Sequence, residues 1–268
     1  MDFTIITPSF NYGRFLGDCL ASVASQPGVT LEHWVFDAGS TDDSAEVAAG
    51  FPHVKWQQEP DQGMSDAINK GLDRAKGDWV IWLNADDRLK ANALCELLKT
   101  LRESTADIVY GDYDFIDAAG AWKRTMKVPR WSSFVNIYHH CYVPSTATFL
   151  RNRTIIAEGY RLRTDFHYVM DGEFYARLNS AGKKFQHAPL PIADFRLHGG
   201  NASQKHLTHS RDIDAILAAE FQHVESRAIR RAYGFPITFK DPYITGLADG
   251  VLSILARGAK FLIRLLPP

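Results

Sequence analysis

Apolar and polar positions alternate with two different periods along the first hundred residues. Four apolar runs have the length and the β-branched or aromatic content of buried strands. They cover residues 3–7, 33–37, 53–58 and 79–83. Between them, apolar residues recur at helical spacing within 15–23 and again within 67–72. Strands that alternate with helices predict parallel strands joined by right-handed crossovers, which is an α/β fold.

Two residues stand where helix-end signals belong. Asn11 precedes the first helical pattern, and Gly77 follows the second. We expect Asn11 to cap the first helix and Gly77 to end the second, because both residue types are common at those positions.

The pattern is less regular after residue 105. Residues 108–128 predict two strands around a turn at Ala119 and Gly120, and residues 146–151 predict another strand. A helix is expected at about 168–181, followed by an extended segment at 183–203 that prolines interrupt. From His206 onwards the pattern is helical, and no linker forces a division into two domains.

Polar, Gly/Asp/Ser-rich segments follow each of the four early strands. They are Thr7–Asn11, Asp37–Ser44, Glu59–Ala67 and Asn84–Asp87. Each segment taken alone is equally well explained as a polar surface loop. Open parallel sheets bind ligands at the carboxyl ends of their strands, so four such segments at one edge predict a binding site.

The fourth segment ends in two adjacent carboxylates, Asp86 and Asp87. Adjacent carboxylates repel each other unless a cation or water compensates them. Oxygen ligands favour a hard ion such as Mg²⁺ or Mn²⁺, whose remaining positions are filled by water and phosphate. In the alternative interpretation, Asp87 caps a helix that begins near Ala91 and Asp86 lies in water.

Composition narrows the function classes further. The formal net charge of −1 gives no general field to attract nucleic acid, so we expect no nucleic-acid partner. The three cysteines are far apart and lack zinc-site spacing, which is typical of reduced thiols in a cytoplasmic protein. The first residues indicate a strand and not an export signal, so the sequons at Asn152 and Asn201 are interpreted as chance matches.

Four segments, in this order and at these intervals, resemble the inverting nucleotide-sugar-dependent glycosyltransferases of family 2. They are TIITPSFNYGRFLGDCLASVASQ, VFDAGSTDDS, EPDQGMSDAINKGLDRAKGDWVIWLNADD and FRLHGGNAS. The resemblance covers about residues 3–203. It implies a GT-A fold, Rossmann-like, with a mixed, mainly parallel sheet flanked by helices, over residues 1–205. The donor would bind to about 1–105 and the acceptor to about 106–205, and 206–268 would be a C-terminal helical extension.

The resemblance also implies site residues. Asp37 falls where an Asp holds the base, usually uracil, and Asp86 falls at the metal-ligand position of the DxD motif. His198 would complete the metal shell or bind phosphate, although a His in a loop is as often plain polar surface. The implied nucleotide-sugar contacts are Thr7, Pro8, Ser9, Asn11, Asp37, Gly63, Asp66, Asn84, Ala85, Asp86 and Arg196. The implied metal ligands are Asp86 and His198, for Mn²⁺ or Mg²⁺.

Deprotonation of the acceptor hydroxyl requires a base. Asp171 matches the family's catalytic Asp, and Glu173 is the second candidate. The two side chains are two positions apart on a predicted helix, so they point in different directions. The alternative for Asp171 is an N-terminal charge that the helix dipole favours.

Two departures from the family pattern support other functions. The first DxD position is Asn84, which brings no charge to a metal, and Met170 stands where a Glu usually precedes the catalytic Asp. A non-catalytic nucleotide-sugar-binding adaptor of a polysaccharide assembly complex is therefore the alternative to an enzyme. A sugar-nucleotide pyrophosphorylase fits less well, because the first strand leads into TPSFNYG and not into a Gly-rich triphosphate loop.

The acceptor and the C-terminus are the least constrained parts. Trp131, Tyr138, His139 and His140 could line an acceptor pocket, but core packing explains them equally well. Residues 246–268 predict an amphipathic helix with its charges in one stripe, suited either to the membrane interface or to packing on protein. The resemblance to the family implies a saccharide or lipid-linked saccharide acceptor. With the interfacial alternative for the helix, we expect peripheral attachment to the cytoplasmic face of the membrane.

Overall fold

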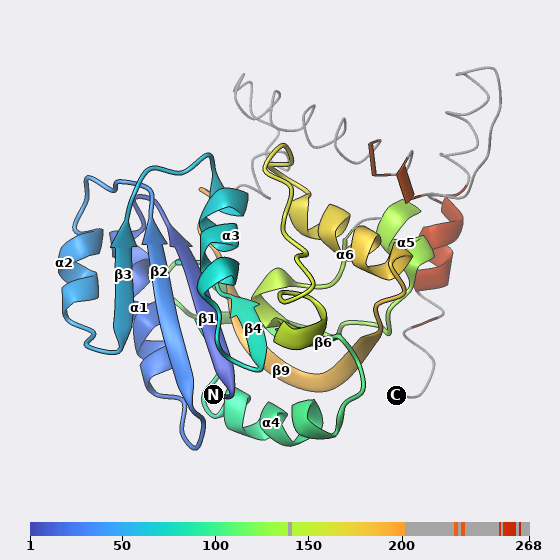
Figure 1. The fold of residues 1–268 in the computed structure, drawn as a ribbon, viewed down its shortest axis with the longest axis horizontal. Coiled ribbons are helices and arrows are strands. Elements are labelled where there is room, and N and C mark those ends of the chain that lie inside the picture. The colour runs from blue at the N-terminus through green and yellow to red at the C-terminus, as the bar shows by residue number, and fades with distance from the viewer. Residues whose placement is uncertain are drawn as a thin grey trace.

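The computed structural model describes residues 1–138, 141–201, 228–229, 232–233, 252, 254–260 and 263. Within these residues, nine strands form one mixed sheet with the order β3-β2-β1-β4-β8-β6-β9-β5, and β7 pairs with β6. Helices cover both faces of the sheet (Figure 1). The predicted α/β class, with a mixed and mainly parallel sheet flanked by helices, is confirmed.

The first half is a parallel sheet with crossover helices. Its strands are β1 (Phe3–Ser9), β2 (Leu31–Asp37), β3 (Val54–Gln58) and β4 (Trp79–Trp82), which pair in parallel. Its helices are α1 (Gly13–Ala24), α2 (Ser44–Ala49), α3 (Met64–Arg74) and α4 (Ala93–Glu103). All four predicted strands are present, whereas the short helix α2 was not predicted.

The second half of the domain extends the sheet with antiparallel and parallel strand pairs. Its elements are β5 (Arg88–Leu89), β6 (Ile108–Asp117), β7 (Trp122–Met126), α5 (Ser133–Tyr138), η1 (Ser145–Ala147), β8 (Thr148–Arg151), η2 (Asn152–Thr154), α6 (Met170–Ser180) and β9 (Phe185–Leu197). The predicted hairpin, strand, helix and extended segment are therefore present. The two-residue strand β5 and the helix α5 lie in stretches too short for periodicity to reveal.

Two buried clusters hold the helices to the sheet. One joins α3 and α6 to one face, through residues such as Ile68, Leu72 and Phe174. The other joins α1 and α4 to the opposite face, through residues such as Cys19 and Leu97. Burial of each apolar side chain removes its surface from water and stabilises the fold by about 1.5–3 kcal/mol. These contacts hold the helices against the sheet, and they thereby fix the position of the edge that carries the polar loops.

The long strand β9 links the two halves. It runs parallel to β6 from Phe185 to Leu197 and pairs in antiparallel register with β5 at Asp194 and Ala193. Since β5 directly follows the Asn84–Asp87 segment, this pairing brings the carboxyl end of β9 to the carboxyl end of β4. The curve of β9 across the sheet is visible in Figure 1.

Both predicted helix-end roles are wrong. Tyr12 is the N-cap of α1, and Asn11 has a left-handed backbone with φ of 57°. The helix α3 ends at Arg74 with Ala75 in an extended conformation, so Gly77 does not cap it. A Cβ on Gly77 would lie 2.3 Å from the backbone carbonyl carbon of Phe3. Gly77 is thus needed for close approach to β1.

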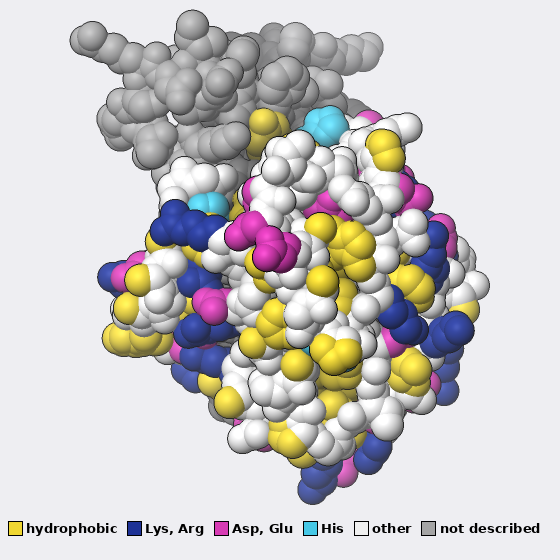
Figure 2. Space-filling model, turned by 90° about the vertical axis from the view of Figure 1, so that its left-hand side faces the viewer, with side chains coloured by type: hydrophobic (Ala, Val, Ile, Leu, Met, Phe, Trp, Pro, Cys, Tyr) yellow, Lys and Arg dark blue, Asp and Glu magenta, His cyan; other side chains and the backbone are white. Residues whose placement is uncertain are grey.

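The face in Figure 2, formed by the side of the molecule that carries β3 and α2, mixes side chains of every kind. Hydrophobic groups form a broken vertical band with Lys and Arg groups on either side, and acidic groups gather in the upper half. The upper half lies toward the carboxyl ends of β1–β3 (Figure 1). On this face, basic charge forms no continuous tract among the described residues.

Most of the extension at 206–268 lies outside the described residues, as do His139 and His140. The described parts of the extension touch the domain: Ile229 and Ala256 are buried, and Tyr233 packs against the core cluster that contains Ile229. Among the described helices, none combines the length and the hydropathy that crossing a bilayer requires.

A buried histidine makes the fold sensitive to acid. His33 on β2 is fully buried beside the hydroxyl of Thr7, with 2.9 Å between His33 Nε2 and Thr7 Oγ1. Burial, followed by the charge of His53, lowers the pKa of His33 from 6.5 to about 3. The folded state therefore keeps a neutral ring where the unfolded chain takes up a proton.

Replacing Gly77 with Ala should lower the free energy of unfolding by about 2–4 kcal/mol, because the new methyl group meets backbone and not a movable side chain. Urea denaturation measures this loss. Gly17→Ala is the matched control, since its Cβ would lie 3.6 Å from Val47 in ordinary contact and in a helix interior. Equal stability of the two variants would contradict the close approach.

Stability should fall as the pH drops from 6.5 toward 3, because in this window the unfolded state binds the His33 proton and the folded state does not. The slope from this residue alone approaches about 1.4 kcal/mol per pH unit. Urea melts at several pH values compare wild type with His33→Gln. The free energy of unfolding of the variant should fall less steeply than that of wild type below pH 6.5, and equally with pH above 6.5. If the two curves of free energy against pH are parallel below pH 6.5, His33 is not the source of the acid sensitivity.

Candidate active site

The carboxyl edge of the parallel strands carries buried polar atoms without a protein partner. Ser9 ends β1 and Asn84 follows β4, its neighbour in the sheet. Within the described residues, Ser9 Oγ and Asn84 Oδ1 are buried and have no hydrogen-bond partner. An unpaired buried polar atom costs about 1–3 kcal/mol. Two of them on adjacent strands indicate a place where a ligand completes the hydrogen bonding.

The loops after β1 and β2 hold each other in place. Asn11 Oδ1 accepts a hydrogen bond from the Thr41 amide at 2.9 Å, and the Asn11 amide donates to Ser40 Oγ at 2.7 Å. One Asp42 oxygen accepts the Gly13 amide at 2.9 Å. The side chain of Asn11 therefore braces the loop after β2, and its left-handed backbone is one that Asn tolerates.

Asp37 is the most buried carboxylate of these two loops. Its oxygens accept the backbone amides of Gly39 and Ser40 at 3.0 and 2.7 Å, together with the Ser40 hydroxyl. A carboxylate offers about four acceptor positions, so one position of Asp37 remains for a ligand. Thr7 and Pro8 are buried within β1, and the Thr7 hydroxyl faces His33.

The loop before α3 turns at Gly63, whose φ is 108°. Asp66 accepts the Gln62 amide at 3.1 Å and lies 3.4 Å from Lys70 Nζ. The neighbouring residue in the helix, Ser65, donates to Met170 Sδ at 2.9 Å. The structure thereby brings Gly63 and the first turn of α3, which contains Asp66, to the start of α6, where Asp171 lies.

Asp86 lies at the centre of a small polar cluster. Its Oδ2 is 3.0 Å from His198 Nε2 and 3.1 Å from Asn201 Nδ2. His198 Nδ1 accepts the Gly200 amide, which leaves Nε2 as the donor toward Asp86. The rings of Phe15 and Tyr12 flank His198 at centroid distances of 4.7 and 5.9 Å. Asp86 and His198 are therefore held together on one side of the site.

Asp87 is turned into the protein. It accepts the backbone amide of Arg196 at 2.9 Å and the Asn84 side-chain amide at 3.3 Å. Burial, and then the charge of Asp86, raises the pKa of Asp87 well above its usual value. Asn92 is the N-cap of α4, so the helix-cap interpretation of Asp87 is wrong, and the buried Asp86 does not lie in water.

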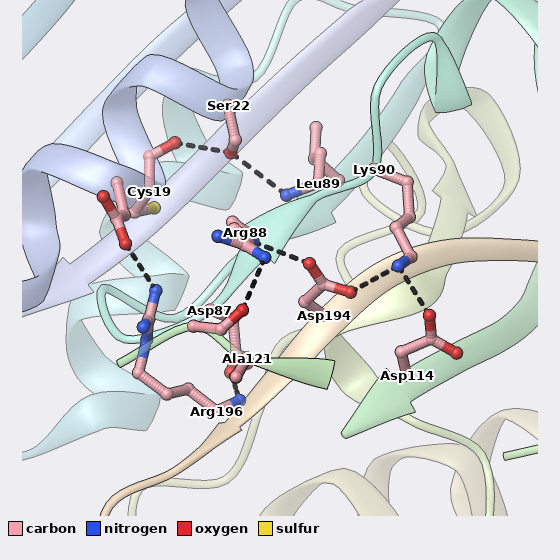
Figure 3. A network of polar contacts seen from close by, with 12 residues as sticks. Cys19, Ser22, Asp87, Arg88, Leu89, Lys90, Asp114, Ala121, Asp194 and Arg196 are labelled. Carbon is pink, nitrogen blue, oxygen red and sulfur yellow. Dashed lines mark hydrogen bonds and ion pairs between the residues drawn. The ribbon is translucent and has the colours of Figure 1, made fainter. Parts of the chain in front are cut away.

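Arg196 connects three parts of the chain to this turn. Its side chain is 1% exposed, and it donates to the Asp86 carbonyl at 2.8 Å, to Asp18 Oδ2 at 2.8 Å and to the Ala118 carbonyl at 3.2 Å. Figure 3 shows Arg196 beneath α1, near the hairpin turn between β6 and β7. All three acceptors of these hydrogen bonds are protein atoms, so the guanidinium holds the Asp86–Asp87 turn in place.

Ion pairs of Arg88 in β5, and of Lys90 just after it, support the same turn. Arg88 Nε lies 2.6 Å from Asp194, and Lys90 Nζ bridges Asp194 and Asp114 (Figure 3). The Leu89 amide donates to Ser22 Oγ on α1 at 3.0 Å. These bonds tie β5 to both α1 and β9, which fixes where the turn ends.

The residues around Asp86 fit a hard divalent cation that binds together with a phosphate ligand. Asp86 Oδ2 and His198 Nε2 are 3.0 Å apart, close to the spacing of neighbouring ligands around an ion with bonds of about 2.1 Å. Ligation through Nε2 would require the ring proton to move to Nδ1, in place of the hydrogen bond from the Gly200 amide. The unpaired Asn84 Oδ1 adds an oxygen acceptor. No group of three or more His, Cys, Asp or Glu side chains in the described part of the chain forms a metal cage. Phosphate and water would therefore complete the coordination.

Asp171 and Glu173 have different surroundings on α6. Glu173 is fully buried, bonds Arg177 at 2.8 and 3.0 Å, and accepts the Tyr233 hydroxyl at 2.8 Å. Asp171 accepts the Gly172 amide at 2.7 Å. Burial raises the pKa of Asp171 from 3.8 to about 6. A carboxylate with this pKa is suited to proton transfer near neutral pH.

The aromatic residues considered for an acceptor pocket lie in the core. Trp131 stacks on Phe185 with ring centroids 3.9 Å apart and donates to Asn179 Oδ1 at 2.7 Å. Tyr138 is 2% exposed and belongs to the buried set. Core packing, the alternative that the sequence left open, describes both residues.

Two residues near the site were missed from the sequence. Asn201 binds Asp86 and also accepts the His198 amide at 2.9 Å through Oδ1, although its sequon had been interpreted as a chance match. Its place in the FRLHGGNAS segment was the available signal. Phe10, at the end of β1, is 55% exposed, which is unusual for a large aromatic side chain at a polar edge.

Comparison with known proteins agrees with this geometry. The profile of the family described as "Glycosyl transferase family 2" matches residues 4–159. A PGL/p-HBAD biosynthesis glycosyltransferase of Mycobacterium tuberculosis is 34% identical over 144 residues, which are 51% of this chain and 56% of that protein. Glycosyltransferase GlyG of Streptococcus pneumoniae is 31% identical over 115 residues, 41% of this chain and 38% of that one. The matches thus span about half or less of these relatives.

Solved structures share the fold at low identity. S. aureus TarS 1-349 in complex with UDP-GlcNAc has a TM-score of 0.64 and 15% identity, over 98% of this chain and 81% of that chain. The mannosyltransferase PcManGT from Pyrobaculum calidifontis, in complex with GDP-Man and Mn²⁺, has a TM-score of 0.58 and 15% identity, over 98% and 84%. The similarity covers both halves of the sheet.

Proposed function

The chain belongs to glycosyl transferase family 2, and we propose that it is an inverting enzyme that uses a nucleotide-sugar donor, most simply a UDP-sugar. The acceptor in this proposal is a hydroxyl of a saccharide or lipid-linked saccharide, in the synthesis of a surface or exopolysaccharide. The observation that carries the proposal is the pair of unpartnered buried atoms, Ser9 Oγ and Asn84 Oδ1, beside the Asp86–His198 pair. A diphosphate and a ribose offer the donors and acceptors that these atoms lack.

The proposed donor site extends along the carboxyl ends of β2, β1 and β4. The free acceptor position of Asp37 suits the imide N–H of uracil, and the exposed ring of Phe10 offers a face on which a base can stack. The Ser9 hydroxyl donates to a ribose or phosphate oxygen, and Asn84 Oδ1 accepts a hydrogen bond from a ribose hydroxyl. Gly63 and Asp66, at the start of α3, close the sugar side. Contacts within the protein that shape the site are made by Thr7, Pro8, Asn11, Ala85 and Arg196.

Asp86 and His198 hold Mn²⁺ or Mg²⁺ in this proposal. The ion supplies positive charge that stabilises the leaving diphosphate by several kcal/mol. Arg196 keeps the turn that carries Asp86 in place, because its guanidinium binds the Asp86 carbonyl. Asn201 orients the Asp86 carboxylate from the other side.

Asp171 is the proposed base. It accepts the proton of the acceptor hydroxyl as that oxygen forms a bond to the anomeric carbon and the bond from this carbon to the diphosphate oxygen breaks. Attack from the side opposite the leaving group inverts the anomeric configuration. Glu173 is already neutralised by Arg177 and is fully buried, so it positions α6 and does not take the proton.

The relatives support the substrate class without fixing it. The mycobacterial relative is named for PGL/p-HBAD biosynthesis, TarS was solved with UDP and with UDP-GlcNAc, and PcManGT with GDP-Man and Mn²⁺. For this chain, UDP, the ion and the lipid-linked acceptor are parts of the proposal. An adaptor without activity is the alternative that Asn84 and Met170 favour, and it predicts tight donor binding without release of nucleoside diphosphate.

Replacing Asp171 with Asn should lower turnover roughly 10²- to 10⁴-fold with donor affinity kept, because the amide cannot accept the proton. Release of nucleoside diphosphate from a panel of nucleotide sugars with Mn²⁺ measures turnover. Wild-type kcat should also fall about tenfold per pH unit below pH 6, where Asp171 becomes protonated.

Two variants serve as controls for this experiment. Asp165→Asn changes an exposed carboxylate just before α6 and should keep wild-type turnover. Glu173→Gln should lower the melting temperature more than it lowers kcat. Near-normal turnover of Asp171→Asn removes Asp171 from the role of base, and binding without release by wild type would favour the adaptor.

Thermal shift with UDP tests the metal site. Wild type should be stabilised more by UDP with Mn²⁺ than by either alone, because the ion and the diphosphate complete each other's contacts. Asp86→Asn and His198→Gln should lose most of this synergy, while Asp61→Asn, in the loop before α3, should retain it. Equal stabilisation by UDP with and without Mn²⁺ would argue against a cation at Asp86.

A further inference from the structure

The C-terminal helix contacts the domain with one of its sides. In its described residues, Ala256 is fully buried, and Ala259 and Ile263 pack against the core cluster that contains α6. The ammonium group of Lys260 lies over the ring of Tyr142, 5.3 Å from the centroid. Figure 1 shows this helix in red beside α5. The helix therefore docks through two alanines, one isoleucine and one lysine.

Two bulky apolar residues of the same helix, Ile254 and Leu255, point away from this contact. Ile254 and Leu255 are 59% and 57% exposed, although they are adjacent and both large. At about 100° per residue, Ile254 lies roughly 160° and Leu255 roughly 100° around the helix axis from Ala256. In the sequence, Phe261, Leu262 and Leu265 share the helical period of this pair, and they lie outside the described residues.

The charge of this segment is opposite to that of the whole chain. Residues 246–268 contain Arg257, Lys260 and Arg264 against Asp249, so three basic residues and one acidic residue give +2, whereas the whole chain carries −1. Arg257 is exposed and adjoins the Ile254–Leu255 pair. Among the described residues, Arg257 is the basic residue exposed beside this pair, since Lys260 lies on Tyr142. Large apolar side chains next to a cation suit the interface of a bilayer with anionic headgroups.

We propose that this helix docks the protein on an anionic lipid surface, with Ile254 and Leu255 inserted and Arg257 at the headgroups. A second copy of the chain is a weaker candidate for this face. A twofold contact through the helix would bring its basic residues toward those of the other copy, and like charges at an interface cost binding energy. A lipid surface instead supplies the opposite charge.

The helix lies close to the proposed base. It packs on Tyr142, and the preceding Cys141 lies against α6, where a Cβ on Gly172 would come within 3.2 Å of the Cys141 Cβ. Asp171 is the residue directly before Gly172. A lipid-linked acceptor held in the same membrane is thus delivered to the side of the domain that carries Asp171. This step rests on the proposed function, whereas the lipid contact itself does not.

Co-sedimentation of the full chain with lipid vesicles tests the contact. Wild type should bind phosphatidylglycerol–phosphatidylcholine vesicles, and should bind pure phosphatidylcholine about tenfold or more weakly. The double variant Ile254→Ser/Leu255→Ser should bind these vesicles about tenfold or more weakly than wild type. The reason is that burial of these two side chains in the lipid contributes most of the insertion free energy. Arg257→Gln should weaken binding to the anionic vesicles alone.

Trp122→Ser is the matched control. Trp122 is 62% exposed on β7, so its removal deletes an equally exposed apolar side chain elsewhere and should leave vesicle binding unchanged. Both sets of substitutions are on the surface, and equal melting temperatures verify folding. The thermal shift by UDP with Mn²⁺ should be the same in every variant, so loss of vesicle binding is separable from failure of the proposed function.

Three results would overturn the proposal. Wild type could fail to bind anionic vesicles, or the double variant could bind them as wild type does. Sedimentation velocity without lipid could also show a wild-type dimer that the double variant loses, which would assign the Ile254–Leu255 face to a second copy of the chain.

Discussion

The structure around the site depends on keeping two neighbouring carboxylates in place at the end of β4. Asp87 is desolvated, and it is satisfied by the backbone amide of Arg196 and the side chain of Asn84. Because Asp87 faces inward, Asp86 faces His198 and Asn201 on the ligand side. The guanidinium of Arg196 then fixes the peptide between the two by binding the Asp86 carbonyl. One residue of β9 thus determines the orientation of both acidic groups.

Much of this arrangement could be predicted from the sequence. Apolar runs with strand length located β1 to β4, and the rule that ligands bind at strand carboxyl ends located Ser9, Asp37 and Asn84 on one edge. The adjacency of Asp86 and Asp87 already indicated that a cation, water or hydrogen-bond donors must compensate the repulsion between two carboxylates. These features are local, so a single chain displays them directly.

What the sequence did not predict depends on partners far along the chain. Arg196 was expected among the nucleotide-sugar contacts, and that expectation stays a prediction. Its bond to Asp18, which is 178 positions away, was not expected, because no periodicity records such a pair. Gly77 was interpreted as a helix end, whereas its lack of a side chain matters for the approach of β1. The docked side of the C-terminal helix is a further example, because alanines and bulky residues are equally apolar in a pattern and only packing tells them apart.

The bond between Asp18 and Arg196 has a consequence for how the molecule acquires its shape. Contacts between such distant positions form only after a long segment of chain has lost its conformational freedom, which makes them slow to establish. The acidic turn is complete only when β9 lies beside β6, because Arg196 binds both Asp87 and the Asp86 carbonyl. The first hundred residues alone would lack Arg196, His198 and Asn201, so the ligand edge that they contain is built in part by the far end of the domain.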